Sequence, residues 1–101
     1  MGEFLLEGLL VPASHPALQG HFPGRPVVPG VVLLDEVVAA IAQWQHQSFV
    51  PTGFPSVKFL QPLLPGETYS IRLNGDAMRI VFECAAGERV LLRGTVTGAV
   101  S

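Results

Sequence analysis

The chain has 101 residues, of which 49% are hydrophobic and only 14% are charged, and its formal net charge at pH 7 is −2. This length predicts a single domain over residues 1–101, and the shortage of charged residues predicts that a partner, most simply a second copy, covers part of its surface. The negative net charge excludes a basic nucleic-acid-binding surface, and the lack of an apolar run of ~20 residues excludes a membrane-spanning helix.

The first third of the chain predicts a strand followed by a long loop. The apolar run Phe4–Val11 lies between turn-forming residues, which is typical of a strand. From Pro12 to Gly30 the sequence is rich in proline and glycine, and the prolines hold the residues before them in extended conformations. A loop of this length is uncommon in a small domain unless it has a function, so we expect functional residues here.

The next predicted element is a helix over residues 31–47, about 25 Å long at 1.5 Å per residue. Its sequence contains no proline or glycine, and Leu34, Val38 and Ile41 have helical spacing. The first half is apolar almost all round, which predicts a buried helix. The polar residues at its end should reach solvent.

The rest of the chain predicts β structure. Four further strands are expected, at Val57–Leu60, Tyr69–Leu73, Met78–Cys84 and Arg89–Thr97. The tripeptide Asn74-Gly75-Asp76 is a hairpin signal, and short connections between the last three strands predict a meander. This order predicts an α+β domain, in which an antiparallel sheet of about five strands wraps round one long central helix.

One histidine has the position of a catalytic base. His21 lies in the proline-rich loop that runs directly into the predicted helix, and a fixed histidine is suited to general base catalysis near neutral pH. The free N–H groups of Gly30 and Val31 at the helix start could stabilise a carbonyl oxygen that acquires negative charge. The alternative is a loop histidine that is packed for its shape alone.

Two acidic residues follow on the same helix. Asp35 and Glu36 have no lysine or arginine three or four positions away. A buried carboxylate without a partner is driven toward its protonated form, which could serve as the acid opposite a histidine base. The two side chains lie about 100° apart on a helix, so we expect only one of them to point inward. The alternative is a pair of first-turn acids that favour the helix dipole.

The loop resembles a known enzyme family. The run His-Phe-Pro-Gly-x-Pro-x-x-Pro-Gly at residues 21–30 resembles the 3-hydroxyacyl-acyl carrier protein dehydratases of the hotdog fold, including 3-hydroxydecanoyl and aryl-polyene-type members. In that family the histidine is catalytic, and an acidic residue follows fourteen positions later, which is Asp35 here. The resemblance implies that Gly30 contacts the thioester carbonyl, and we expect Phe22 and Val31 to contribute to the same substrate site.

A second stretch extends the resemblance, and one position departs from it. Residues 58–67, Lys-Phe-Leu-Gln-Pro-Leu-Leu-Pro-Gly-Glu, are similar to the family's second strand and its Pro-Gly turn. Family members often carry glutamine four residues after the acid, where this chain has Ala39. Gln43 stands one helical turn further on.

The resemblance implies an enzyme that removes water from a 3-hydroxyacyl thioester in fatty-acid, polyene or glycolipid-type synthesis. His21 would take the proton from the carbon next to the carbonyl, and Asp35 would protonate the departing hydroxyl. The thioester would be carried on acyl carrier protein or CoA, and the reaction requires no metal or redox cofactor. We expect a homodimer or a dimer of dimers in the cytoplasm.

Two other functions remain open at this point. Hotdog thioesterases use a helix carboxylate to activate water, so thioester hydrolysis is one alternative. A non-catalytic module that binds acyl chains or a carrier protein is the other. The His-Phe-Pro-Gly loop argues against the thioesterase, and the presence of both His21 and Asp35 argues against the non-catalytic module.

Overall fold

The computed structural model describes residues 2–12, 14–15, 27–76 and 78–100, which form one helix and five strands. The elements in chain order are β1 (Glu3–Leu9), α1 (Gly30–Gln45), β2 (Phe49–Phe59), β3 (Tyr69–Gly75), β4 (Arg79–Ala86) and β5 (Arg89–Val100). This is the predicted order, β-α-β-β-β-β.

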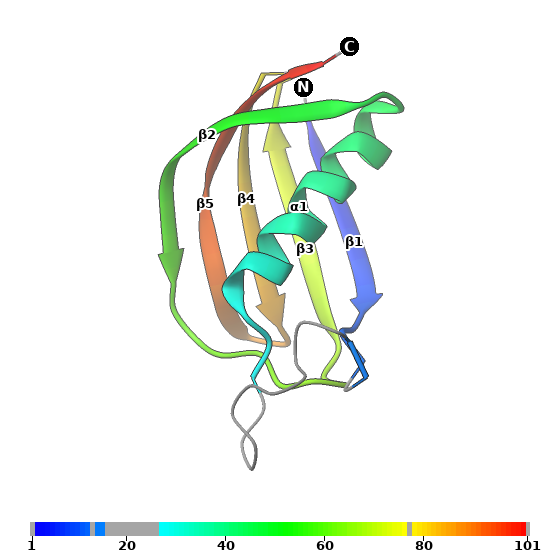
Figure 1. Ribbon diagram of the computed structural model, residues 1–101, viewed down its shortest axis with the longest axis vertical. Coiled ribbons are helices and arrows are strands. Elements are labelled where there is room, and N and C mark those ends of the chain that lie inside the picture. The colour runs from blue at the N-terminus through cyan, green and yellow to red at the C-terminus, as the bar shows by residue number, and fades with distance from the viewer. Residues whose placement is uncertain (1, 13, 16–26, 77, 101) are drawn as a thin grey trace.

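The five strands form one antiparallel sheet in the order β1-β3-β4-β5-β2. The predicted meander is confirmed, because β3, β4 and β5 are neighbours in the sheet as well as in the sequence. α1 crosses one face of the sheet, and β2 sweeps over the end of the helix to reach the outer edge of β5 (Figure 1). The sheet therefore wraps round the helix, as predicted for the hotdog fold.

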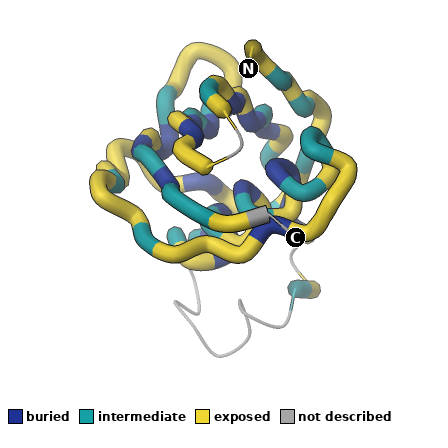
Figure 2. The backbone as a smooth tube through the Cα atoms, turned by 90° about the horizontal axis from the view of Figure 1, so that it is seen from above, coloured by how far each residue is buried: buried dark blue, intermediate teal, exposed yellow. Residues whose placement is uncertain are grey.

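The core lies between α1 and the inner face of the sheet. Burial alternates along β4, where Ile80, Phe82 and Cys84 are buried and the residues between them are more exposed. The helix supplies the opposite wall with its buried residues Val32, Leu33, Val37, Ala40 and Ile41. The buried segments in Figure 2 gather where the helix and the sheet face each other.

β2 is longer than predicted, because it begins eight positions before Val57, at Phe49. Pro51 and Pro55 suggested a loop, but β2 is an edge strand, where a residue without an N–H group removes no essential ladder hydrogen bond. The pairing with β5 shifts register twice in this region, between Pro51 and Gly53 and between Gly53 and Ser56. These irregularities let the strand pass both prolines and remain in the sheet.

The helix ends earlier than predicted, at Gln45, and His46 explains the difference. His46 adopts the left-handed conformation with φ of 56°, and its N–H lies 3.4 Å from the carbonyl oxygen of Gln43. The N–H of Gln47 donates to the carbonyl of Ala42 at 3.2 Å. These two bonds satisfy carbonyl groups that the helix leaves free and so terminate it.

The prediction that α1 is buried almost all round is wrong for a single chain. One side of the helix packs on the sheet, whereas Val31 on the other side is 62% exposed. Asp35, Glu36, Ala39 and Gln43 are exposed as well. Within the described part of the chain, the sheet covers only one side of the helix, so Val31 in the first turn remains open to solvent whereas Val32 and Leu33 are buried.

Two glycines in the β2–β5 pair test how tightly these strands pack. A Cβ at Gly94 would lie 3.0 Å from Val57 Cα and closer still to the carbonyl oxygen of Ser56, whereas a Cβ at Gly53 would find only Thr97 Oγ1, at 3.5 Å. We expect Gly94→Ala to lower the free energy of unfolding by about 1–3 kcal/mol, because the obstructing atoms are backbone atoms of Ser56 and Val57 and the ring of the buried Phe82. Gly53→Ala should leave it within about 0.5 kcal/mol. Urea unfolding midpoints compare the two, and equal losses would contradict this packing.

Candidate active site

At the start of α1, the backbone N–H groups of Gly30 and Val31 have no hydrogen-bond partner among the described residues. Pro29 precedes the helix, and among the described residues no side chain caps it. The N–H of Val32 donates to the carbonyl of Pro29 at 3.0 Å, whereas the N–H groups of Gly30 and Val31 lie before any intrahelical acceptor. The helix dipole adds positive potential at this end. This position can therefore bind an oxygen that carries negative charge.

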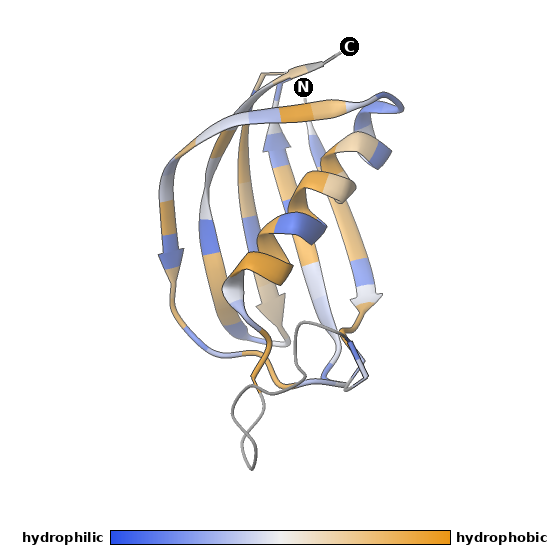
Figure 3. Ribbon diagram, viewed as in Figure 1, coloured by the Kyte–Doolittle hydropathy of each residue, from blue (hydrophilic) through white to orange (hydrophobic). Residues whose placement is uncertain are grey.

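Asp35 lies one turn further along the side of the helix that begins at Val31. Val31, Asp35, Ala39 and Gln43 are four residues apart, and all four are exposed. Side chains with this spacing are neighbours on one face, with Cβ atoms about 5–6 Å apart. The helix is hydrophobic at its start and hydrophilic one turn later (Figure 3). The predicted acid and the predicted carbonyl site therefore lie on adjoining turns of one helix.

Glu36 faces a different part of the molecule. Burial raises the pKa of the Tyr69 hydroxyl on β3, and the nearby carboxylate of Glu36 raises it further. The charge of Glu36 therefore acts on β3 through Tyr69. The expected divergence of the two carboxylates is consistent with this interaction, and Asp35 remains the predicted catalytic acid.

The apolar sequence of the helix predicts buried carboxylates, but in one chain both are exposed. The helix covers the sheet with its other side, so the described residues of one chain do not supply the desolvation that we expected for Asp35. The alternative interpretation also loses its basis, because the first turn of α1 contains no acidic residue. The dipole effect falls off within the first turn, and Asp35 and Glu36 lie beyond it.

An apolar cavity of about 350 Å³ opens beside the first turn of the helix. Its wall includes residues from the approach to α1, from the helix itself, from the end of β2 and the segment after it, and from β5: Val28, Gly30, Leu33, Phe59, Leu60, Gln61, Pro62, Leu63, Leu91 and Leu92. The N–H of Val28 donates to the carbonyl of Leu63 at 2.9 Å, which fixes two sides of the cavity to each other. This volume is at the lower end of the range for small-molecule sites.

His21 and Phe22 lie outside the described residues. Their assignment as catalytic base and substrate contact therefore stays a prediction from the sequence. The geometry that the structure does give, at Gly30, Val31 and Asp35, belongs to the helix that directly follows their loop.

Other reactive groups do not form a second centre in the described residues. Cys84 is fully buried, and its burial raises the thiol pKa to about 12, which keeps it protonated and unreactive. No three histidine, cysteine or acidic residues converge among the residues that the structure describes. The helical residues described also lack a stretch with the length and hydropathy of a membrane span.

Phe59 is a site residue that the sequence analysis missed. A Cβ at Gly30 would lie 2.9 Å from Cδ1 and Cζ of the Phe59 ring, and closer still to Cε1. Glycine at position 30 therefore has a packing reason, in addition to the predicted approach of a substrate carbonyl. The signal in the sequence was the stretch Lys58–Glu67, which carries Phe59 and was interpreted there only as a strand and a turn.

Comparison with known sequences connects this geometry to a family of enzymes. Residues 5–95 match the model of the ApeI-like protein family, which is described as ApeI dehydratase. The 3-hydroxyacyl-acyl-carrier-protein dehydratase FabZ of Roseiflexus sp. (strain RS-1) is 34% identical over 77 residues, which cover 69% of this chain and 54% of that protein. FabZ of Symbiobacterium thermophilum is 34% identical over 76 residues, which cover 68% and 54%. The chain spans about half the length of the curated relatives it matches.

Solved structures give the same picture of the fold. The dehydratase heterocomplex ApeI:P from Xenorhabdus doucetiae is similar with a TM-score of 0.81 and 26% identity, over 97% of this chain and 88% of that chain. A probable thioesterase from Bartonella henselae is similar with a TM-score of 0.73 and 15% identity, over 100% and 91%. At that identity, the likeness to the thioesterase concerns the fold alone.

Proposed function

The chain belongs to the family of ApeI-like dehydratases, and on this basis we propose that it removes water from a 3-hydroxyacyl thioester to give a trans-2-enoyl thioester. The observation that carries the proposal is the arrangement of α1, which presents the N–H groups of Gly30 and Val31 in its first turn and Asp35 in the next. Both features lie within the matched stretch and directly follow the loop that contains His21.

Each of these groups has one task in the proposed reaction. The imidazole of His21 removes a proton from the carbon next to the thioester carbonyl, and the electron pair moves toward the carbonyl oxygen. The N–H groups at the start of α1 stabilise the negative charge that develops on this oxygen. When the carbonyl re-forms, the hydroxyl on the next carbon leaves with its bonding electrons and accepts a proton from Asp35, which gives water.

The substrate class follows from the relatives. The FabZ proteins are named as dehydratases of 3-hydroxyacyl groups on acyl carrier protein, so an acyl-carrier-protein or CoA thioester is the proposed substrate. The elimination involves no change in oxidation state overall, so it requires no redox cofactor. Synthesis of a fatty acid, a polyene or a glycolipid in the cytoplasm would supply such a thioester.

A second copy of the chain would complete the site. The exposed side of α1 carries Asp35 and Val31, and a catalytic acid that acts on an apolar substrate must be shielded from water. Exposed apolar side chains on the edge strand β2, at Val50 and Phe54, add to the surface that a partner would cover. A homodimer or a dimer of dimers is therefore proposed. The similar ApeI:P structure is a heterocomplex, so a partner chain of different sequence is the alternative to a second copy.

Incubation with a 3-hydroxyacyl thioester distinguishes the candidate functions. We expect an enoyl thioester as the product. Its formation is measured by its ultraviolet absorbance and, in mass spectrometry, by the loss of the mass of one water. Release of free thiol, measured with a thiol reagent, would instead indicate a thioesterase. An unchanged substrate that nevertheless binds would indicate a non-catalytic acyl-binding module. Either of these results would contradict the proposed dehydration.

A further inference from the structure

The apolar cavity beside α1 adjoins the free N–H groups of the proposed carbonyl site. Gly30 belongs both to the helix start and to the cavity wall, and Leu33 lines the cavity one turn further on. Among the described residues that line the cavity, Gln61 is the only one with a polar side chain. A thioester whose carbonyl accepts hydrogen bonds from the helix start would therefore have its acyl tail next to this apolar cavity.

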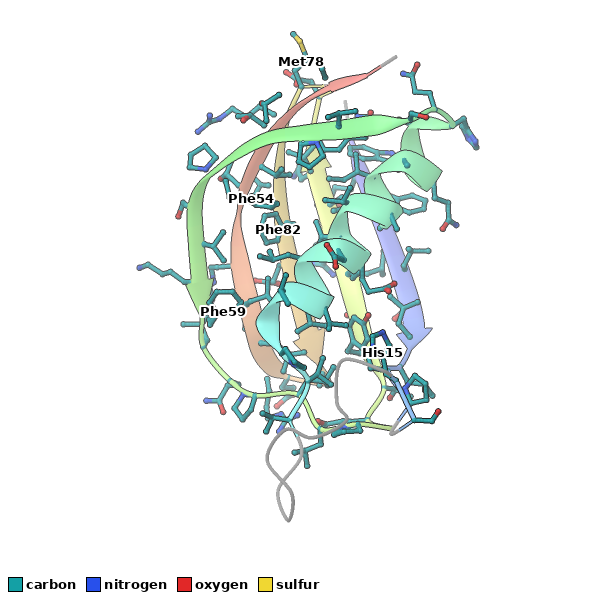
Figure 4. All side chains as sticks on the ribbon, viewed as in Figure 1. His15, Phe54, Phe59, Met78 and Phe82 are labelled. Atoms are coloured by element: carbon teal, nitrogen blue, oxygen red, sulfur yellow. The ribbon has the colours of Figure 1, made fainter. Side chains whose placement is uncertain are left out.

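Phe59 lies at the junction between the carbonyl site and the cavity. It is the last residue of β2, its partner on β5 is Leu92, and its ring lies against Gly30. The side chain is labelled at the lower end of β2 in Figure 4, near the first turn of α1. The residue is nevertheless 59% exposed, so one side of the ring touches the helix start while much of the rest is open to solvent.

The backbone at Phe59 is fixed, whereas its ring has room to rotate. The N–H groups of Leu60 and Gln61 both donate to the carbonyl of Leu91, at 2.8 and 3.2 Å, which holds the end of β2 against β5. An exposed ring on a fixed backbone can change rotamer without unfolding the strand. Phe59 is thus placed to obstruct or to open the space next to Gly30.

From this geometry we propose that Phe59 determines the length of the acyl chain that the site accepts, by limiting the passage from the carbonyl site into the cavity. This inference rests on the proposed dehydration and names the substrate range of that site. The cavity volume of about 350 Å³ has room for on the order of ten methylene groups, if each takes about 30 Å³, the volume per molecule in liquid water. The tail of a medium-length acyl chain is the occupant that fits this volume and its apolar lining.

Variants that change the ring in opposite directions test the proposal. Phe59→Ala opens the passage, and Phe59→Trp narrows it. For 3-hydroxyacyl thioesters of about 4, 8 and 12 carbons, we expect Phe59→Ala to raise the ratio of kcat/KM for the long over the short substrate by about 10-fold or more. Phe59→Trp should lower the same ratio.

Leu64→Ala is the matched control. Leu64 is an apolar residue of the same segment and is 50% exposed, but it does not line the cavity. Its substitution should leave the ratio unchanged, and light scattering should give one mass for all four proteins. Unchanged ratios in both Phe59 variants would overturn the proposal. A loss of assembly in Phe59→Ala would also overturn it, since Phe59 would then serve the contact between copies.

A binding measurement separates this inference from the proposed function. Titration with unreactive acyl thioethers of the same lengths reports chain preference even in the absence of turnover. If the wild-type protein dehydrates no substrate but the affinities follow the size of residue 59, the dehydration is wrong and the role of Phe59 stands. If the wild-type protein dehydrates its substrates and neither readout depends on residue 59, only the role of Phe59 is wrong.

Discussion

Asp35→Asn is expected to lower kcat for dehydration by about 10²–10⁴-fold while the protein remains folded. Asparagine keeps the size of the side chain and removes the proton that the departing hydroxyl must take. Asp35 is exposed and contributes nothing to the core between α1 and the sheet, so the substitution should not change the midpoint of urea unfolding. Single-turnover formation of the enoyl thioester measures the chemical step directly.

Glu36→Gln is the control for this prediction. Glu36 is the next residue on the helix and is equally exposed, but its charge acts on Tyr69 on the β3 side. Its substitution should leave kcat close to the wild-type value. If Glu36→Gln loses activity and Asp35→Asn retains it, the catalytic acid has been assigned to the wrong carboxylate.

Most of the fold could be predicted because the spacing of apolar residues and the positions of turn residues are local features of the sequence. The proline-free stretch after Gly30 predicted α1, and alternation in residues 69–97 predicted the meander. β2 was predicted too short, because local sequence does not reveal that Pro51 and Pro55 stand on an edge strand. Phe54 belongs to this missed part, and its ring packs edge-on against the buried Phe82, with ring centroids 6.4 Å apart. Such a tertiary contact leaves no periodic signal.

The features of the candidate site also divide into those that are local in the sequence, which could be predicted, and those that depend on tertiary structure, which could not. Gly30 and Asp35 could be placed on one helix from the sequence, because helix starts and helical spacing are local properties. The exposure of Asp35 could not be predicted, since it depends on which side of the helix the sheet covers. Phe59 was missed because its contact with Gly30 joins residues 29 positions apart in the chain.

The exposure of Asp35 leads to the last prediction, which concerns a site shared between two copies. If His21 of one copy faces Asp35 of the other, homodimers of His21→Ala and of Asp35→Asn are each nearly inactive. A mixed dimer of the two variants then has one site with both wild-type residues and one site with neither. We expect it to recover up to about half of the wild-type activity, because intact sites are catalytically independent of the damaged ones.

Co-expression of the two variants with different affinity tags, followed by purification over both tags, isolates the mixed dimer. Light scattering should give the sum of the masses of the two tagged chains, where each chain without its tag is 10.8 kDa. The control is a mixture of the two separately purified homodimers, assayed before their subunits exchange, which should remain inactive. If the mixed dimer is folded and as inactive as its parents, both residues of each site come from the same chain. The exposure of Asp35 on α1 would then not indicate a shared site, because a second copy would not be required to bring His21 to Asp35.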